Sequence, residues 1–176
     1  SRWVEDTITV KTTPIYEALK LITKITDVDV SNNEDITNIN PLSELSELRS
    51  LDCSNTKVSD ISPIRNHNKI KELNISNTKV TDISNLKYAN VVQSFKADNL
   101  NIADISIVTF FDDLTNLSLS HTNVNDISPI AECKNLSSLN LSHTKIDILT
   151  ALKGLDKLHY LDVSNNNIND IEPLRN

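Results

Sequence analysis

The chain has 176 residues and a formal net charge of −7, with 38% hydrophobic and 23% charged residues. It contains no run of about 18 apolar residues that could span a bilayer, and its Lys and Arg residues do not cluster. The sequence therefore predicts neither membrane insertion nor binding to nucleic acid. Because it lacks Met, we expect the chain to be a processed or excised segment.

Residues 1–24 differ from the rest of the chain. Polar and apolar residues alternate over residues 7–10, which predicts a short strand. Thr13 and Pro14 then provide an N-cap and a first helical residue, and apolar residues recur at helical spacing through about Lys24. We therefore predict an N-terminal cap over residues 1–24, made of a short strand and a helix.

Residues 25–176 form a repeat. Its seven strand-bearing copies start near Val28, Leu51, Leu73, Phe95, Leu117, Leu139 and Leu161, with an interval of 22 residues except for 23 between the first two. Leu51 and Cys53 alternate with polar residues, a pattern typical of a strand with one buried face. In the fourth copy, Phe95 and Phe111 predict a core rebuilt around aromatic rings. A period of this length predicts a solenoid whose strands stack as a parallel sheet.

The motifs LRSLDCSNTKV, LTNLSLSHTNV, LSSLNLSHTKI and LHYLDVSNNNI resemble the leucine-rich repeat pattern LxxLxLxxN/TxI. The tails DISPI at Asp60 and Asp126 and DIEPL at Asp170 resemble internalins, a family of bacterial surface proteins whose repeats share length and layout with the regulator of type-1 protein phosphatase. The resemblance implies an α/β leucine-rich-repeat solenoid, with a curved parallel sheet on the concave face, a convex side rich in 3-10 helices and turns, and a short N-terminal helical cap. We expect no C-terminal cap after Leu174, so a second copy or an adjoining domain would cover the last repeat.

Several recurring polar residues are interpreted as structural. An Asn or a Thr at the ninth repeat position is expected to bond buried backbone groups, and a recurring Asp to bond the turn that follows it. These columns are Asn33, Thr56, Thr78, Thr122, Thr144 and Asn166, and Asp60, Asp82, Asp104, Asp126 and Asp170. Cys53 and Cys133 are three repeats apart, too far for a disulfide, and are expected to be free and buried. His67 occupies a core slot and is expected to be partly buried with a local partner.

Three histidines raise the question of a metal site. His121 and His143 hold the same position in adjacent repeats and are expected to stack, and His159 lies one strand further along. Three imidazoles can hold zinc, but the sequence contains no HExxH motif and no paired CxxC motif. A polar ladder in place of Asn55, Asn77 and Asn165 is the preferred interpretation. We predict no metal, no cofactor and no catalytic residues.

The outward strand positions and their flanks form the candidate binding surface. Its residues are Arg49, Ser50, Asp52, Glu72, Asn74, Lys96, Asn116, Ser118, His121, Ser138, Asn140, His143, His159, Tyr160 and Asp162. A third outward column is nearly all Ser, interrupted by Asp98. Tyr160, Arg49 and the histidines are the residue types that favour binding hot spots. Phe110 and Trp3 are alternative anchors, whereas Phe111 is expected in the core.

These patterns predict a non-catalytic protein–protein interaction module. The resemblance to internalins favours an exported or surface-displayed protein with a role in adhesion or virulence, which would bind a host or partner protein through its concave face. One alternative is an intracellular, cytoplasmic scaffold that regulates an enzyme, as the phosphatase regulator does. A second alternative is a structural spacer between other domains.

Overall fold

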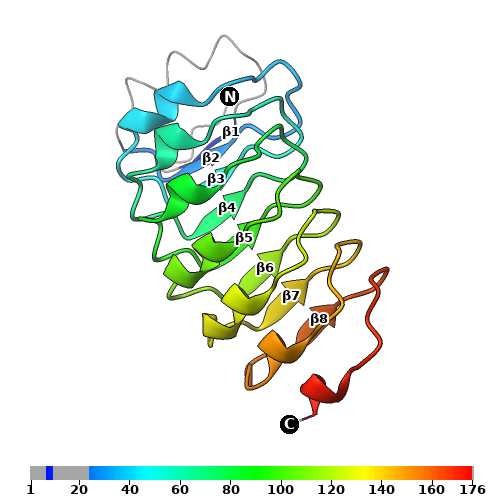
Figure 1. The fold of residues 1–176 in the computed structure, drawn as a ribbon. Coiled ribbons are helices and arrows are strands. Elements are labelled where there is room, and N and C mark those ends of the chain that lie inside the picture. The colour runs from blue at the N-terminus through cyan, green and yellow to red at the C-terminus, as the bar shows by residue number, and fades with distance from the viewer. Residues whose placement is uncertain (1–6, 10–23, 176) are drawn as a thin grey trace.

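A computed structural model describes residues 7–9 and 24–175. The strands form one parallel sheet in chain order, and Figure 1 shows them stacked along one side of the coil. They are β1 (Thr7–Thr9), β2 (Asp27–Asp29), β3 (Ser50–Asp52), β4 (Glu72–Asn74), β5 (Ser94–Lys96), β6 (Asn116–Ser118), β7 (Ser138–Asn140) and β8 (Tyr160–Asp162). The predicted strand near residue 7 is thus present, and it pairs with β2 of the first repeat. The predicted helix at residues 13–24 lies outside the described residues, apart from Lys24.

Strand register follows the repeat. Val28 pairs with Leu51, Leu51 with Leu73 and so on to Leu161, so the extra residue of the first repeat falls in its return segment and leaves the pairing in phase. Each strand is only three residues long, with its central residue buried in β2 to β7. The parallel solenoid predicted from the 22-residue interval is confirmed.

Short 3-10 helices lie on the side of the coil opposite the strands (Figure 1). They are η2 (Asn40–Glu44), η3 (Ser62–Ile64), η4 (Ser84–Leu86), η5 (Ser106–Phe110), η6 (Ser128–Glu132), η7 (Thr150–Leu152) and η8 (Glu172–Leu174). Proline occupies an early position in η2, η3, η6 and η8, where its missing N–H costs no helical bond. An Asp stands two residues before the first helical Ser and accepts its backbone N–H. Asp60 accepts from Ser62 at 2.7 Å, and Asp126 accepts from Ser128 at 2.8 Å. The turn role predicted for this column is confirmed.

One continuous apolar core runs between the sheet and the 3-10 helices. In the fourth repeat, the rings of Phe95 and Phe111 meet edge to face with centroids 5.6 Å apart, and both are buried. This arrangement is favourable for aromatic rings and confirms the predicted aromatic core. In the last repeat, Leu161 and Val163 are only half-buried because they have neighbours on one side.

The bend after each strand from β2 to β8 is closed by one residue in the left-handed region. Its φ lies between 53° and 57° at Asn32, Asn55, Asn77, Asn99, His121, His143 and Asn165. Asn tolerates this conformation better than most residues. The following Thr or Asn then bonds the end of the strand: Thr56 Oγ1 donates to the Cys53 carbonyl at 2.7 Å, and Asn166 Nδ2 donates to the Val163 carbonyl at 3.0 Å. The ladder predicted for the ninth position is therefore confirmed.

The core also contains unusual polar groups. Cys53 and Cys133 are free and buried, as predicted, and burial raises the pKa of their thiols to about 12 and about 11. His67 is buried, and its Nε2 lies 3.0 Å from the carbonyl oxygen of Leu42. The partner of His67 therefore belongs to the preceding repeat and is not local, which corrects the prediction. Burial lowers the pKa of His67, because a charged imidazole is poorly solvated there.

Candidate functional site

A shallow hollow of about 500 Å³ lies on the exposed face of the sheet between β4 and β8. Predicted site residues that line it are Glu72, Lys96, Asn116, Ser118, Ser138, Asn140 and Tyr160. Each comes from a strand, so the 22-residue repeat brings side chains together that are up to 88 residues apart in sequence. We call this surface the sheet hollow.

The other predicted residues surround the sheet hollow. Ser50, Asp52 and Asn74 continue the same columns toward the N-terminal end, on β3 and β4. Arg49 and His159 directly precede β3 and β8, so they lie at the start of their strands. Asp162 ends β8, and His121 and His143 follow the ends of β6 and β7. His159 and the other two histidines thus lie at opposite ends of the strands.

The last residue of most strands accepts a hydrogen bond from the bend that follows, a role that the sequence analysis did not predict. Asp52 Oδ1 accepts the backbone N–H of Ser54 at 2.9 Å and its hydroxyl at 2.6 Å. Asp29, Asn74, Asn140 and Asp162 accept the N–H two residues ahead in the same way, at 2.9 to 3.1 Å. For Asp162, the hydroxyl and N–H of Ser164 lower the pKa of the carboxyl group. These side chains satisfy backbone donors at the bend, a role that limits their use in binding.

Two repeats depart from this scheme and compensate. Lys96 cannot accept a hydrogen bond, and the N–H of Asp98 donates to Ser76 Oγ at 3.0 Å. In the next repeat, Ser118 occupies the position equivalent to Lys96. Asp98, from the preceding repeat, accepts the Ser120 N–H at 2.7 Å and the Ser118 hydroxyl at 2.6 Å through its Oδ1. Asp98 thus takes over the capping of the following bend. Lys96, relieved of that duty, is exposed.

The third outward column is not an open surface. The structure buries Ser54, Ser76, Ser120 and Ser142, and Ser120 and Ser142 bond each other at 2.9 Å between their hydroxyl oxygens. The prediction that this column lies outward is therefore wrong for its central members. The strands end two residues before these serines, so strand alternation no longer applies to them, and their small side chains lie against the neighbouring repeats.

His121 and His143 stack as predicted, with ring centroids 4.0 Å apart and planes 12° apart. Both are exposed and occupy the left-handed position that Asn holds in other repeats. His159 is separate from this pair, and its Nδ1 faces the carbonyl oxygen of Lys157. Within residues 7–9 and 24–175, no three His, Cys, Asp or Glu side chains are grouped to hold a metal ion.

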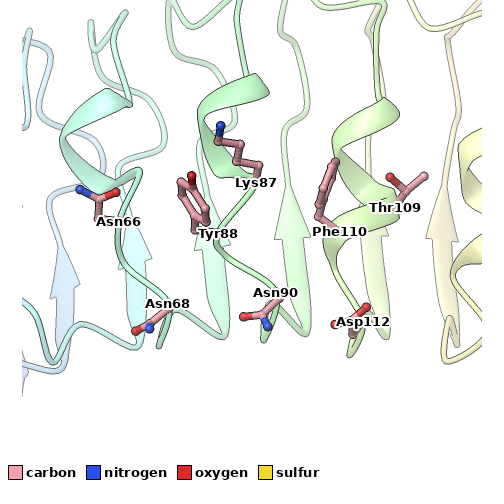
Figure 2. A pocket seen from close by; sticks show the side chains of 8 residues that line it. All are labelled: Asn66, Asn68, Lys87, Tyr88, Asn90, Thr109, Phe110 and Asp112. Atoms are coloured by element: carbon pink, nitrogen blue, oxygen red, sulfur yellow. The ribbon is translucent and has the colours of Figure 1, made fainter.

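A second depression lies on the flank of the coil, formed by residues that follow η3 and η4 and by the end of η5 with Asp112 after it. It has a volume of about 640 Å³ and is lined by Asn66, Asn68, Lys87, Tyr88, Asn90, Thr109, Phe110 and Asp112, which Figure 2 labels. We call it the side groove. Phe110 was considered from sequence, but Tyr88 was missed. The signal was available: Ala89 and Phe111 hold the core slot, so the residue before each must point outward.

Comparisons with known proteins agree with this geometry. A family model for leucine-rich repeats in two copies matches residues 46–88, 112–154 and 134–176, more than half of the chain. Internalin C2 from Listeria monocytogenes matches with a TM-score of 0.86 and 26% identity, over 97% of this chain and 72% of that chain. No curated protein sequence matches the chain.

Two more distant structures share the fold. A leucine-rich-repeat protein from Leptospira interrogans has a TM-score of 0.80 and 21% identity, over 87% of this chain and 40% of its own. The ectodomain of the Arabidopsis thaliana receptor kinase GASSHO1/SCHENGEN3, solved in complex with CASPARIAN STRIP INTEGRITY FACTOR 2, has a TM-score of 0.75 and 24% identity, over 84% of this chain and 19% of its own. In the part of the chain that the structure describes, no helix is long and apolar enough to span a membrane.

Proposed function

Because this chain belongs to the leucine-rich-repeat family, we propose that it is a non-catalytic interaction module that binds a partner protein through the sheet hollow. The observation that carries this proposal is the state of three side chains in the hollow. Glu72, Lys96 and Tyr160 are all exposed, and no hydrogen bond or ion pair within the described residues engages them. They come from three different strands of one rigid sheet, a preorganised arrangement that lowers the entropic cost of binding.

Tyr160 is the proposed anchor. Its side chain is 53% exposed at the β8 end of the hollow, and tyrosine supplies a large contact area with little loss of conformational freedom. Lys96 and Glu72 place one positive and one negative charge in the same hollow. This pairing favours a partner surface with charges of both signs around an apolar contact.

Cys53, Cys133 and Ser137 lack the surroundings that activate a nucleophile. The thiols of Cys53 and Cys133 are buried with raised pKa values, so they are not thiolates at neutral pH. Ser137 Oγ lies 3.5 Å from His159 Nδ1, but the same nitrogen faces the Lys157 carbonyl, which only an Nδ1–H can bond. A protonated Nδ1 cannot accept the serine proton, so this pair lacks the arrangement of a nucleophile and its base.

We further propose that the module is exported and displayed on a bacterial surface. The similarity to internalin C2 over 97% of this chain supports that setting. An intracellular scaffold of an enzyme and a structural spacer are the competing functions. They differ from the first in the compartment that contains the partner, and in whether the sheet hollow has a partner at all.

A capture experiment with matched variants tests the proposal. The chain is immobilised and exposed separately to a host-cell surface extract and to cytosol, beside a Tyr160→Ala/Lys96→Glu variant. Ile148→Ala/Lys153→Glu is the control, since Ile148 is 60% exposed outside both the sheet hollow and the side groove of Figure 2, and the charge change is identical. We expect a surface protein that the first variant loses and the control retains.

Other outcomes decide between the alternatives. A cytosolic partner with the same sensitivity to Tyr160 and Lys96 would favour the scaffold. Equal capture by both variants, or no specific capture from either extract, would overturn the sheet hollow as a binding site and favour the spacer. Asp52 and Asn74 are left unchanged in these variants because their side chains cap the bends, so their loss would confuse folding with binding.

A further inference from the structure

The side groove contains two rows of side chains set by the repeat. Asn66, Tyr88 and Phe110 are spaced 22 residues apart, and so are Asn68, Asn90 and Asp112, so each row takes one residue from each of three consecutive repeats. Figure 2 shows the two aromatic rings projecting from successive return segments, with the second row along the lower edge. The groove thus combines aromatic rings with amide and carboxylate groups at a fixed spacing.

The two rings lie outside the apolar core. Tyr88 and Phe110 are 54% and 51% exposed, whereas the residue after each is buried in the core. At the same repeat position, other copies have Glu44, Glu132 and Gly154. Two half-exposed aromatic rings on consecutive repeats form an apolar surface that a ligand can cover. The Lys87 ammonium lies 5.0 Å from the Tyr88 ring centroid, a contact that favours a fixed ring orientation.

The polar groups of the groove are available to a ligand. Within the described residues, the side chains of Asn66, Asn68 and Asn90 make no hydrogen bond. Elsewhere in this chain, asparagines of neighbouring repeats bond each other, as Asn55 does with Asn32 at 3.0 Å. Each free amide offers both a donor and an acceptor, and Asp112 adds a carboxylate acceptor.

The charge of the groove narrows the class of ligand. Among the described residues that line the groove, Lys87 and Asp112 are the charged ones, so the local charges cancel, and a phosphate or an acidic peptide would gain no net attraction. A neutral sugar matches the groups present. Its hydroxyls both donate and accept hydrogen bonds, as the amides do, and its ring presents weakly positive C–H groups that fit the negative face of an aromatic ring.

We propose that the side groove binds a neutral oligosaccharide. Tyr88 and Phe110 each take the apolar face of one sugar unit, and the amides of Asn66 and Asn90 with Asp112 bind its hydroxyls. The two rings come from consecutive repeats, so the groove presents one ring per repeat along its length. The site is on the flank of the coil, so it is separate from the sheet hollow and does not depend on the function proposed for it.

Titration with defined sugars tests this site. The full chain is titrated calorimetrically with neutral hexasaccharides of glucose, mannose, galactose and N-acetylglucosamine. We expect at least one to bind with a Kd of millimolar or lower, and Tyr88→Ala/Phe110→Ala to weaken it at least tenfold. Tyr160→Ala removes an equally exposed ring from the sheet hollow and is expected to leave the Kd unchanged.

The variants also guard against loss of folding. Both rings are half exposed, so the double variant should keep the circular dichroism spectrum of the parent chain and a cooperative thermal transition. Asn66→Ala/Asn90→Ala tests the amides without touching a ring. Binding of none of the four sugars, or equal binding by the parent and the double ring variant, would overturn the proposal. Loss of a protein partner instead of a sugar upon the ring changes would also overturn it.

Discussion

Asp98 belongs to the divergent fourth repeat and caps the bend of the repeat that follows it. Its Oδ1 accepts the Ser120 N–H at 2.7 Å and the Ser118 hydroxyl at 2.6 Å. Asp98→Ala leaves both donors without this acceptor, and because Ser120 is only 8% exposed, water cannot readily replace it. A buried donor left without a partner costs about 1–3 kcal/mol. We therefore predict that this substitution lowers the free energy of unfolding by about 2 kcal/mol.

Three further variants isolate the capping bond. Asp98→Asn keeps an acceptor oxygen and should lose less than about 1 kcal/mol. Ser118→Asp, added to Asp98→Ala, places a carboxylate at the position from which Asp52 caps Ser54, and should recover most of the lost stability. Asp112→Ala is the control, since that carboxylate is exposed and makes no bond within the described residues, and it should change stability by less than about 0.5 kcal/mol.

Urea unfolding followed by circular dichroism and tyrosine fluorescence provides the measurement. Coincident transitions by the two probes establish that the solenoid unfolds as one unit, which repeat proteins do not always do. With equal slopes, the shift in midpoint gives the change in free energy. Equal midpoints for Asp98→Ala and Asp112→Ala, or no recovery with Ser118→Asp, would refute the assignment of Asp98 as the cap of the Ser120 bend.

Other residues give independent tests. Phe95→Ala should cost about 3–5 kcal/mol in urea unfolding because it empties the centre of the aromatic core, whereas Phe110→Ala, half exposed, should cost less than about 1 kcal/mol; similar losses would contradict the core assignment. The lowered pKa of His67 means that the unfolded chain binds a proton more readily, so stability should fall as pH drops below about 6.5. His67→Leu should flatten the dependence of the melting temperature on pH between 7 and 5, and an unchanged slope would rule out this histidine as its source. Cys53 and Cys133 should resist a thiol reagent at pH 8 in the folded chain and react fully in urea, and rapid native labelling would contradict their burial.

Most of the fold could be predicted from the sequence because of the repeat. Most residues that pack between the strands and the 3-10 helices recur at the same repeat position, so a sequence period suffices to place them. The Thr and Asp columns were also predictable, because each must bond a backbone group that recurs with the bend. Even the stacking of His121 on His143 follows from their equal position in adjacent repeats.

The candidate binding surface was harder to predict than the core, because alternation along a strand gives only the side of the sheet to which a residue points. It does not reveal that Asp52 turns its carboxylate back to Ser54, nor that Ser76 and Ser120 are buried beyond the bend. Those facts depend on the course of the backbone after the strand has ended and on the stacking of neighbouring repeats, neither of which strand alternation describes. His67 was misjudged for a related reason: its partner, Leu42, is 25 residues away and is brought close only by stacking.

Many polar side chains at the strand ends accept hydrogen bonds from the bends, so they are not free to bind a partner. Side chains that cap bends cannot vary without loss of stability, so recognition is left to positions without a bond, such as Glu72 and Tyr160 on the sheet, and Tyr88 and Phe110 on the flank. Lys96 shows how a binding position can arise at the cost of a cap, because it stands where other repeats have an Asp or Asn that accepts the N–H of the bend. Ser76 and Asp98 supply the missing caps, and a free cation appears in the sheet hollow. If Lys96 is exposed for binding rather than by chance, Lys96→Asn should restore a cap, raise the stability of the chain and weaken partner capture in the same variant.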